Sequence, residues 1–475
     1  MKRKEESLDP EDWDKMDTLA ARMAKDMVSY HKNIREYPVL VLPTQEIIGQ
    51  LAEPLPIRPS NPEKVYSDFK EKIFSNHGAF ACHPSMWSTV MGTGTTLGAL
   101  ADMWMSGLNG ISSLDISFSS YVELQVLSWI KEMLGYPDEA SGVLTSGGSI
   151  ANLLGLIVAR DSKAGYDVKL EGSRGDLVFY GSDELHYCHQ KNLESMGIGR
   201  RNLRKIGTDS EYKIDLEKLR NQIEKDRDDG LNPVCVIGCA GSTNTGSIDD
   251  LEKLKQICDE YNMWFHVDAA FGAWAAITPN YKHLVRGMEQ ADSLAVDLHK
   301  WMYMPYGIGV TLVRDSEAHY RSFREQADYI THGRALSDLT LELSKPFRSL
   351  KVWMSLKEHG VEKYGRIVEQ NILQAKYLAE FIENSAVFEL LAPVSLNVVS
   401  LRYIGNGLNE EAIDSINRKF RERYFSETPS FCPGESVVNG KFCWRICFTN
   451  HRTKIADIDN MMDWITKTGQ ELTHQ

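Results

Sequence analysis

Two short segments carry residue types that could do chemistry together. One is an apolar run that ends in Asp268 and Ala270, and the other is a similar run that ends in His299 and Lys300. Because an unpaired buried charge is unfavourable, we expect these end residues to point into a site. Asp and Lys at the ends of neighbouring strands suit pyridoxal phosphate. The amine would form a Schiff base with the cofactor aldehyde, and the carboxylate would keep the pyridine nitrogen protonated.

Each of these residues also has a simpler interpretation. Lys300 could extend from a strand end into solvent, and Asp268 could cap the turn that follows it. The two segments together favour the cofactor. In a pocket beside a basic His and an electron-poor ring, we expect the pKa of Lys300 to be lowered, which would make it an amine nucleophile.

A glycine-rich segment could bind the phosphate of such a cofactor. Gly147 and Gly148 permit a close approach of the backbone, and Ser149 begins a run typical of a helix. A helix N-terminus with a nearby hydroxyl is suited to an anion. An ordinary glycine-rich helix start remains the alternative.

Two further residues follow predicted strands. The imidazole of His186 could stack on the cofactor ring, or it could be a structural histidine. The hydroxyl of Thr243, in a Gly-Ser-Thr-Asn-Thr-Gly segment, could reach a phenolic oxygen or the Asp268 carboxylate. A plain turn is the alternative for that segment.

The elements that must position these residues alternate along the chain. Strand-like runs are predicted at residues 176–181, 233–240, 263–269 and 293–298. Helices are predicted at 215–227 and 251–262, with Asp215 and Asp249 as caps. This alternation favours a mostly parallel sheet with helices on both faces, in which ligands lie at the carboxyl ends of the strands.

The chain divides into three predicted parts. Residues 1–63 form a helical arm and a proline-rich extended strap, 64–346 the large domain, and 347–475 a small domain. We expect the first helix to begin at Asp9-Pro10 and to run to about residue 35. Its apolar stripe must be covered by a distant segment or a second subunit. Residues 316–346 are predicted to be a polar, mobile lid.

The composition excludes some classes of partner. With 475 residues and a net charge of −13, the chain is not suited to nucleic acid or an anionic membrane as its main partner. No apolar run reaches the length of a membrane span, and no secretory signal is visible. The eight cysteines are scattered without a metal-binding spacing, so we expect reduced thiols, no metal and a cytoplasmic location.

Taken together, the motifs resemble the group II pyridoxal-phosphate-dependent amino acid decarboxylases. The similarity runs in order through nearly the whole chain. It includes His83-Pro84, Leu100-Ala101-Asp102, residues 146–149, Ser182-Asp183 with His186, 241–246, 266–270, 299–301, 347–351 and 450–453. The resemblance implies the aspartate aminotransferase fold (fold type I): an α/β protein with a mostly parallel seven-stranded sheet and a smaller α+β C-terminal domain. It also implies an obligate homodimer whose N-terminal arm crosses to the partner.

The resemblance further implies roles for individual residues. Lys300 is the aldimine lysine, Asp268 the partner of the pyridinium, His186 the stacking imidazole, and Ala270 the small residue under the ring. Gly148, Ser149 and His299 contact phosphate. The implied reaction is loss of carbon dioxide from an L-amino acid, after which Cα is reprotonated to give the amine.

The sequence departs from the family pattern in the loop that normally carries the tyrosine thought to protonate Cα. Leu339 occupies that place, and a hydrocarbon cannot donate a proton. Either Tyr329 or His332 serves instead, or protonation is slow and oxygen intercepts the reaction, as in the related aldehyde synthases. A cofactor-binding homologue without activity, acting as a regulatory partner, is the third hypothesis.

The substrate is only weakly indicated. The aligned pocket segment holds Trp87 and Met91, which permit an aromatic amino acid. No Arg stands out as a partner for a side-chain carboxylate, which disfavours glutamate and aspartate. A carbon–carbon lyase acting on an amino phosphate would need extra basic residues in the pocket, and none is evident.

Overall fold

The seven-stranded sheet carries the site. The computed structural model describes residues 6–325, 335–427 and 430–474. The strand order is β2-β8-β7-β6-β5-β3-β4, and β8 runs antiparallel to both of its neighbours while the others are parallel. The strands are β2 (Ser141–Thr145), β3 (Leu177–Ser182), β4 (Leu203–Ile206), β5 (Asn232–Cys239), β6 (Trp264–Asp268), β7 (Ser293–Asp297) and β8 (Gly309–Val313). The predicted α/β fold class and its mostly parallel seven-stranded sheet are confirmed.

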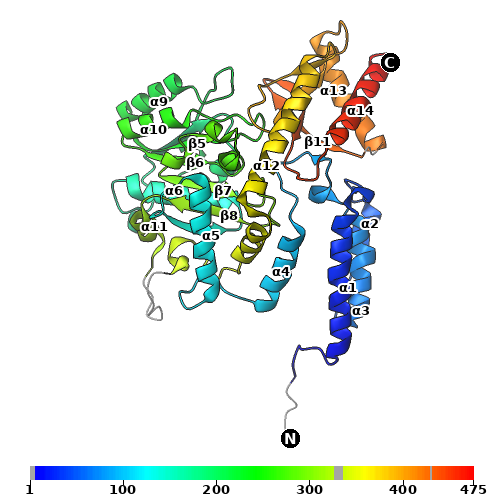
Figure 1. Cartoon of the computed structure of the whole chain (residues 1–475). Coiled ribbons are helices and arrows are strands. Elements are labelled where there is room, and N and C mark those ends of the chain that lie inside the picture. Colours follow the sequence, from blue (N-terminus) through cyan, green and yellow to red (C-terminus); the bar gives the residue numbers. More distant parts are fainter. Residues whose placement is uncertain (1–5, 326–334, 428–429, 475) are drawn as a thin grey trace.

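Both faces of this sheet are covered by helices, which explains why its strands read as continuous apolar runs. On β3, Val178 and Tyr180 lie in one core and Leu177 and Phe179 in another, as side chains alternate along a strand. The helices around the sheet are α4 (Thr96–Leu108), α5 (Phe118–Leu134), α6 (Gly148–Lys163), α7 (Val168–Glu171), α8 (Cys188–Ser195), α9 (Leu216–Asp228), α10 (Leu251–Glu260) and α11 (Ser316–Phe323). Figure 1 shows them around the strands.

One helix cap differs from the prediction. Asp215 caps α9 as expected, accepting hydrogen bonds from the backbone of its first turn. The cap of α10 is Asp250, whose side chain accepts from the Lys253 N–H, and not Asp249. Asp249 is buried and accepts instead from the backbone N–H groups of Ile214 and Cys239. It therefore joins the end of β5 to the segment that precedes α9.

A second sheet of five strands has the order β1-β11-β12-β10-β9. The strands are β1 (Met86–Trp87), β9 (Phe388–Leu390), β10 (Val398–Tyr403), β11 (Cys432–Val438) and β12 (Lys441–Cys447), with the helices α12 (Ser349–Glu383), α13 (Glu410–Glu427) and α14 (Ile455–Thr473). Gly360, with φ at 68°, interrupts the helical backbone of α12. Strand β1 comes from far earlier in the chain than its neighbours. The predicted domain division stays a prediction.

The N-terminal arm extends from the rest of the molecule (Figure 1). Helix α1 (Trp13–Lys32) begins later than predicted because Asp12, not Asp9, caps it by accepting from the Lys15 N–H. The strap is not wholly extended, since α2 (Gln45–Gly49) and α3 (Pro62–Asp68) interrupt it. Leu19 is the only residue of α1 that is buried.

The described parts of the predicted lid are packed against the large sheet. His319 of α11 is fully buried, and its ring bonds the Ser141 hydroxyl and the Leu339 carbonyl. Lys345 is buried and pairs with Glu123. Residues 316–323 of the predicted lid thus form a packed helix, whereas Leu341 and Leu343 are exposed, and the mobility of this segment stays a prediction. Within the described residues, no helix is long and apolar enough to cross a bilayer.

Candidate active site

A cavity of about 310 Å³ opens beside the carboxyl ends of β5, β6 and β7. This is the edge where a parallel sheet places its ligands, because helix N-termini and strand ends converge there. All nine residues predicted to contact the cofactor line it: Gly147, Gly148, Ser149, His186, Thr243, Asp268, Ala270, His299 and Lys300. Five different loops or strand ends therefore converge on one space.

Lys300 follows β7 and has an acidic neighbour. Its Nζ lies 3.1 Å from Oδ2 of Asp297, the last residue of that strand. Burial alone would lower the pKa of Lys300, but the charges of Asp297 and Asp268 outweigh it and raise the pKa. The expectation of a lowered pKa is thus wrong for the free side chain, because sequence reasoning gave Asp297 no role. The amine is cationic at neutral pH until something displaces its proton.

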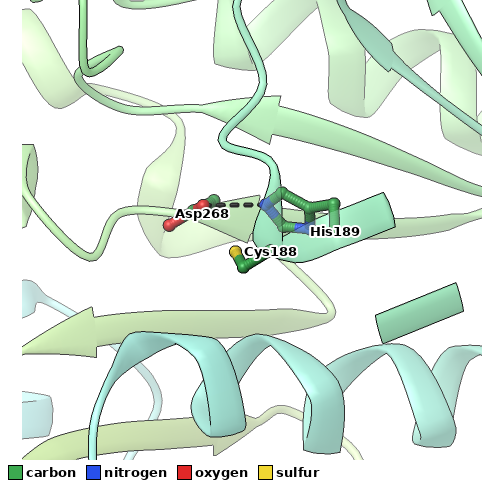
Figure 2. Close-up of side chains that lie close together, drawn as sticks. All are labelled: Cys188, His189 and Asp268. Atoms are coloured by element: carbon green, nitrogen blue, oxygen red, sulfur yellow. Dashed lines mark hydrogen bonds and ion pairs between the residues drawn. The ribbon is translucent and has the colours of Figure 1, made fainter. Parts of the chain in front are cut away.

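Asp268 is held by two donors, of which Figure 2 shows His189. The Nε2–H of His189 donates to its Oδ2 over 2.8 Å, and the backbone N–H of Ala270 donates to Oδ1 over 3.1 Å. Burial would raise the pKa of Asp268, but the His189 bond and the charges of His189 and Lys300 hold it well below its usual value. The carboxylate is ionised, as a partner for a protonated ring nitrogen must be. In the described chain no hydrogen bond joins it to Thr243.

The N-terminus of α6 forms an anion cradle. Gly148 begins this helix, and a Cβ there would lie 2.6 Å from Asp297 Oδ2 and 3.0 Å from the Ala270 Cβ, so only glycine fits. His299 closes the cradle, with its Nδ1 2.8 Å from the Ile308 carbonyl oxygen. Burial lowers the pKa of His299. A helix N-terminus, a serine hydroxyl and an imidazole together can hold a phosphate.

His186 and Thr243 lie on further walls of the cavity. The ring of His186 is half-buried, and burial lowers its pKa, so it is neutral and free to stack on a flat ligand. The loop of Thr243 is fixed from the second sheet, because Arg445 of β12 donates to the Thr243 carbonyl over 2.8 Å. The two sheets therefore both contribute to the site.

The segment after β1 forms part of the wall. The backbone N–H of Gly92 donates to the His299 carbonyl over 3.0 Å, and Val90 faces the cavity. The prediction for Trp87 is wrong: its side chain is fully buried in the second core, with its indole N–H donating to the Thr453 hydroxyl. Met91 also lies outside the cavity lining. The residue of this segment that lines the cavity, Val90, lies a few positions after the predicted Trp87, because the Trp87 side chain in β1 points into the second core.

The structure places one of the three loop residues discussed above. Tyr329 and His332 lie outside the described residues. Leu339 is half-buried in a separate hollow beside Tyr121 and Leu124, not in the Lys300 cavity.

Sequence reasoning missed two groups that act directly on the site, Asp297 and His189. Asp297 ends a strand in the same way as Asp268, so its position was a usable signal. His189 lies three residues after His186, in the first turn of α8, and its backbone N–H bonds the His186 carbonyl just before the helix. Neither could be found from a glycine or lysine motif.

The fold and this cavity define a class of enzyme that binds a phosphorylated aldehyde cofactor through a lysine. The chain matches the family described as "Pyridoxal-dependent decarboxylase conserved domain" over residues 43–404. It belongs to this family, whose members are carboxy-lyases that use pyridoxal phosphate. The cradle of α6, the ionised Asp268 and the amine of Lys300 fit the phosphate, ring nitrogen and aldehyde of that cofactor.

Several characterised proteins are similar along nearly their whole length. An aromatic-L-amino-acid decarboxylase of Bacillus atrophaeus is 31% identical over 466 residues, which cover 95% of each chain. A phenylacetaldehyde synthase of Petunia hybrida is 27% identical over 96% of this chain and 94% of its own. A crystal structure of Oryza sativa TDC with PLP and tryptamine superposes with a TM-score of 0.90 at 22% identity, covering 98% of this chain and all of that one. This last likeness concerns the fold.

Proposed function

We propose that the protein decarboxylates an aromatic L-amino acid to the corresponding amine and carbon dioxide. The observation that supports this most is the convergence of the Lys300 amine, the ionised Asp268 and the α6 N-terminus on one cavity. Pyridoxal phosphate, when bound, supplies an electron sink for the bond that breaks. Every other task falls to side chains of the protein.

We assign these tasks as follows. Lys300 holds the cofactor aldehyde covalently, and Asp268 keeps the ring nitrogen protonated. His186 stacks on one face of the ring, and Ala270 packs against the other. Gly147, Gly148, Ser149 and His299 bind phosphate, and Thr243 orients the phenolic oxygen.

The substrate class rests on the relatives and on the cavity wall. Two of the similar proteins are named for aromatic compounds, an aromatic-L-amino-acid decarboxylase and a phenylacetaldehyde synthase, while a third is an L-2,4-diaminobutyrate decarboxylase. Val90, Ile150 and Phe271 give the cavity apolar surface, and among the described residues no arginine lines it. An apolar wall without a guanidinium favours a ring over a second carboxylate.

The test is a screen of the common amino acids for release of carbon dioxide. We expect turnover with phenylalanine, tyrosine, tryptophan or their hydroxylated forms, and little with glutamate or aspartate. Lys300→Ala should lose turnover and the visible absorbance of bound cofactor, while Lys163→Ala, a half-buried change at the end of α6 and outside the cavity lining, should keep both. Turnover confined to acidic amino acids would contradict the substrate assignment.

A second candidate reaction is oxidative. Leu339 replaces the loop tyrosine, and one similar protein is a phenylacetaldehyde synthase. In this reaction the amino acid, oxygen and water give the aldehyde, carbon dioxide, ammonia and hydrogen peroxide, with oxygen as the two-electron oxidant. Measuring amine, aldehyde and peroxide from one substrate separates the two reactions. Stoichiometric amine without peroxide would eliminate the second.

We also propose a homodimer. Large apolar side chains lie exposed on neighbouring surfaces, more than a monomer usually leaves open to water. They include Trp13, Met23, Leu51, Leu55, Ile57, Met103, Trp104, Ile116, Phe118, Tyr121 and Leu124. Light scattering of the purified protein should give twice the mass of 53.8 kDa. The eight free cysteines are consistent with the cytoplasmic location that we propose.

A further inference from the structure

We propose that His189 is a positioning residue that fixes the Asp268 carboxylate against the ring nitrogen of the cofactor. This inference rests on the proposed function, because it assumes that Asp268 meets that nitrogen. It assigns His189 to the site, although this residue belongs to none of the sequence motifs from which the site was predicted.

The first observation is that the side chain of His189 is buried and hydrogen-bonded to Asp268. Its side chain is fully buried, and its Nε2–H donates to Asp268 Oδ2 over 2.8 Å (Figure 2). The second ring nitrogen, Nδ1, is buried and has no hydrogen-bond partner among the described residues. A buried ring with an unpaired nitrogen is unfavourable, and an apolar residue would fill the space without that penalty. Among the described residues, the bond to Asp268 is the hydrogen bond that the ring makes, beside an edge-on contact with the His266 ring.

The second observation is the geometry of the carboxylate itself. The Ala270 N–H holds Oδ1 and the His189 N–H holds Oδ2, so the two donors fix both the position and the plane of the group. A carboxylate has about four lone-pair positions, so one further donor can still be accepted. A protonated ring nitrogen in the cavity is suited to be that donor.

The third observation is the anchoring of α8, the helix that carries His189. The backbone N–H of His189 donates to the carbonyl of His186, which lines the cavity. Asn192, on the next turn, donates through its side chain to the Ser149 carbonyl over 3.0 Å. One short helix thus sets the distance between the stacking imidazole, the phosphate cradle and Asp268.

A metal ion is the competing explanation for this cluster. Cys188, His189 and Asp268 each place a ligand atom within 4.8 Å of the others. However, burial raises the pKa of the Cys188 thiol, and a protonated thiol is a poor ligand. The Nε2 of His189 already shares its proton with Asp268 over 2.8 Å, so only the unpaired Nδ1 could bind a metal. The hydrogen-bonded arrangement is therefore the one that the geometry favours.

The test compares variants at position 189 in the cofactor-free and reloaded enzyme. His189→Leu removes the donor, His189→Asn is too short to reach Asp268, and His189→Gln keeps an N–H near the position of Nε2. Gln190→Leu, on the same helix but directed elsewhere, is the matched control. The measurements are the equilibrium affinity for pyridoxal phosphate and the ¹⁵N resonance of the labelled ring nitrogen at pH 8.

We expect the Leu and Asn variants to bind the cofactor about tenfold more weakly, since a hydrogen bond to a charged group is lost. Their ring nitrogen should move toward the resonance of neutral pyridine. The Gln variant should recover most of both properties, and Gln190→Leu should match the wild type. If Leu does not fold, the Asn and Gln pair carries the comparison.

Three outcomes would overturn the proposal. One is an unchanged ring-nitrogen resonance with affinity within about twofold of wild type. Another is a loss of thermal stability alone, which would make His189 purely structural. The third is stoichiometric metal in the purified protein that disappears in both His189→Leu and Cys188→Ala. By contrast, a wild type that binds no pyridoxal phosphate would refute the proposed function itself.

Discussion

The Lys300 amine and the Asp297 carboxylate form an ion pair of 3.1 Å inside the cavity. Because Asp297 is buried and joins Asp268 in raising the pKa of Lys300, the free lysine is a cation. A cation is not a nucleophile, so the pair delays the covalent attachment of a cofactor. The same carboxylate lies beside Gly148, at the N-terminus of α6 where we propose that the phosphate binds.

Asp297→Asn should therefore speed cofactor loading at neutral pH. Removal of the charge lowers the pKa of Lys300, so the rate, which rises with pH as the amine loses its proton, should reach its plateau at lower pH. Stopped-flow absorbance of the cofactor-free protein mixed with pyridoxal phosphate measures this. Pyridoxal, which lacks the phosphate, is the control for repulsion between anions. An identical pH profile for both proteins with pyridoxal would contradict the argument.

Gly92→Ala should damage the site without touching any group that reacts. The new Cβ would lie 2.1 Å from the Lys300 carbonyl oxygen, so the Lys300 segment must shift. We expect at least about a tenfold loss of kcat/KM, because small displacements of reacting groups are costly. Gly107→Ala, in α4 with nothing within 4 Å of its Cβ, is the matched control and should keep full activity. Equal activity in the two variants would contradict this prediction, because it would show that the Lys300 segment can shift without loss of activity.

His266→Gln should change how stability depends on pH. Burial holds the pKa of His266 at about 3, whereas an unfolded histidine titrates at 6.5. Between those values the unfolded chain binds one more proton, so this residue makes stability fall as pH decreases below 6.5. The variant should reduce the slope of unfolding free energy by about 1.4 kcal/mol per pH unit near pH 5.

The exposed His474→Gln variant is the control for this experiment, and it should leave the slope as it is. Denaturant unfolding of the cofactor-free protein between pH 4.5 and 7.5 gives the slopes. Parallel curves for wild type and His266→Gln would contradict the assignment of a neutral buried imidazole.

Tyr329→Phe and His332→Gln should alter the products rather than cofactor binding. If Tyr329 protonates Cα, its loss lowers the yield of amine and raises that of aldehyde and peroxide, and the same reasoning applies to His332. Product ratios under air and under argon measure this, and the visible absorbance of bound cofactor serves as the control. Unchanged ratios in both single variants and in the double variant would exclude the two residues as proton donors.

The sequence predicted the parts of the molecule that depend on local patterns. β-branched runs marked β3, β5, β6 and β7 to within about two residues, because a sheet covered on both faces needs continuous apolar strands. Asp268 and Lys300 could be placed at the same edge from that pattern alone. The role of each remains a proposal, although the structure brings their side chains together.

Several features of the site could not be predicted from the sequence, because they depend on contacts between distant segments of the chain. Trp87 was predicted to meet substrate, but β1 pairs with β11 and turns the indole into the second core. The bond from His189 to Asp268 arises only when α8 meets the end of β6, whereas Asp297 lies three residues before Lys300 and was overlooked. Asp249 does not cap α10 as predicted, because the side chain of the next residue, Asp250, accepts the hydrogen bond from the first turn of that helix.

The two-residue strand β1 has a mechanical consequence. Its hydrogen bonds fasten it to the C-terminal sheet, while Gly92, a few residues later, is bonded to the His299 backbone of the other sheet. Val90, which lines the cavity, is therefore tethered on one side to the C-terminal sheet and on the other to the Lys300 segment. Any shift of one sheet relative to the other would change the shape of the cavity wall at this residue.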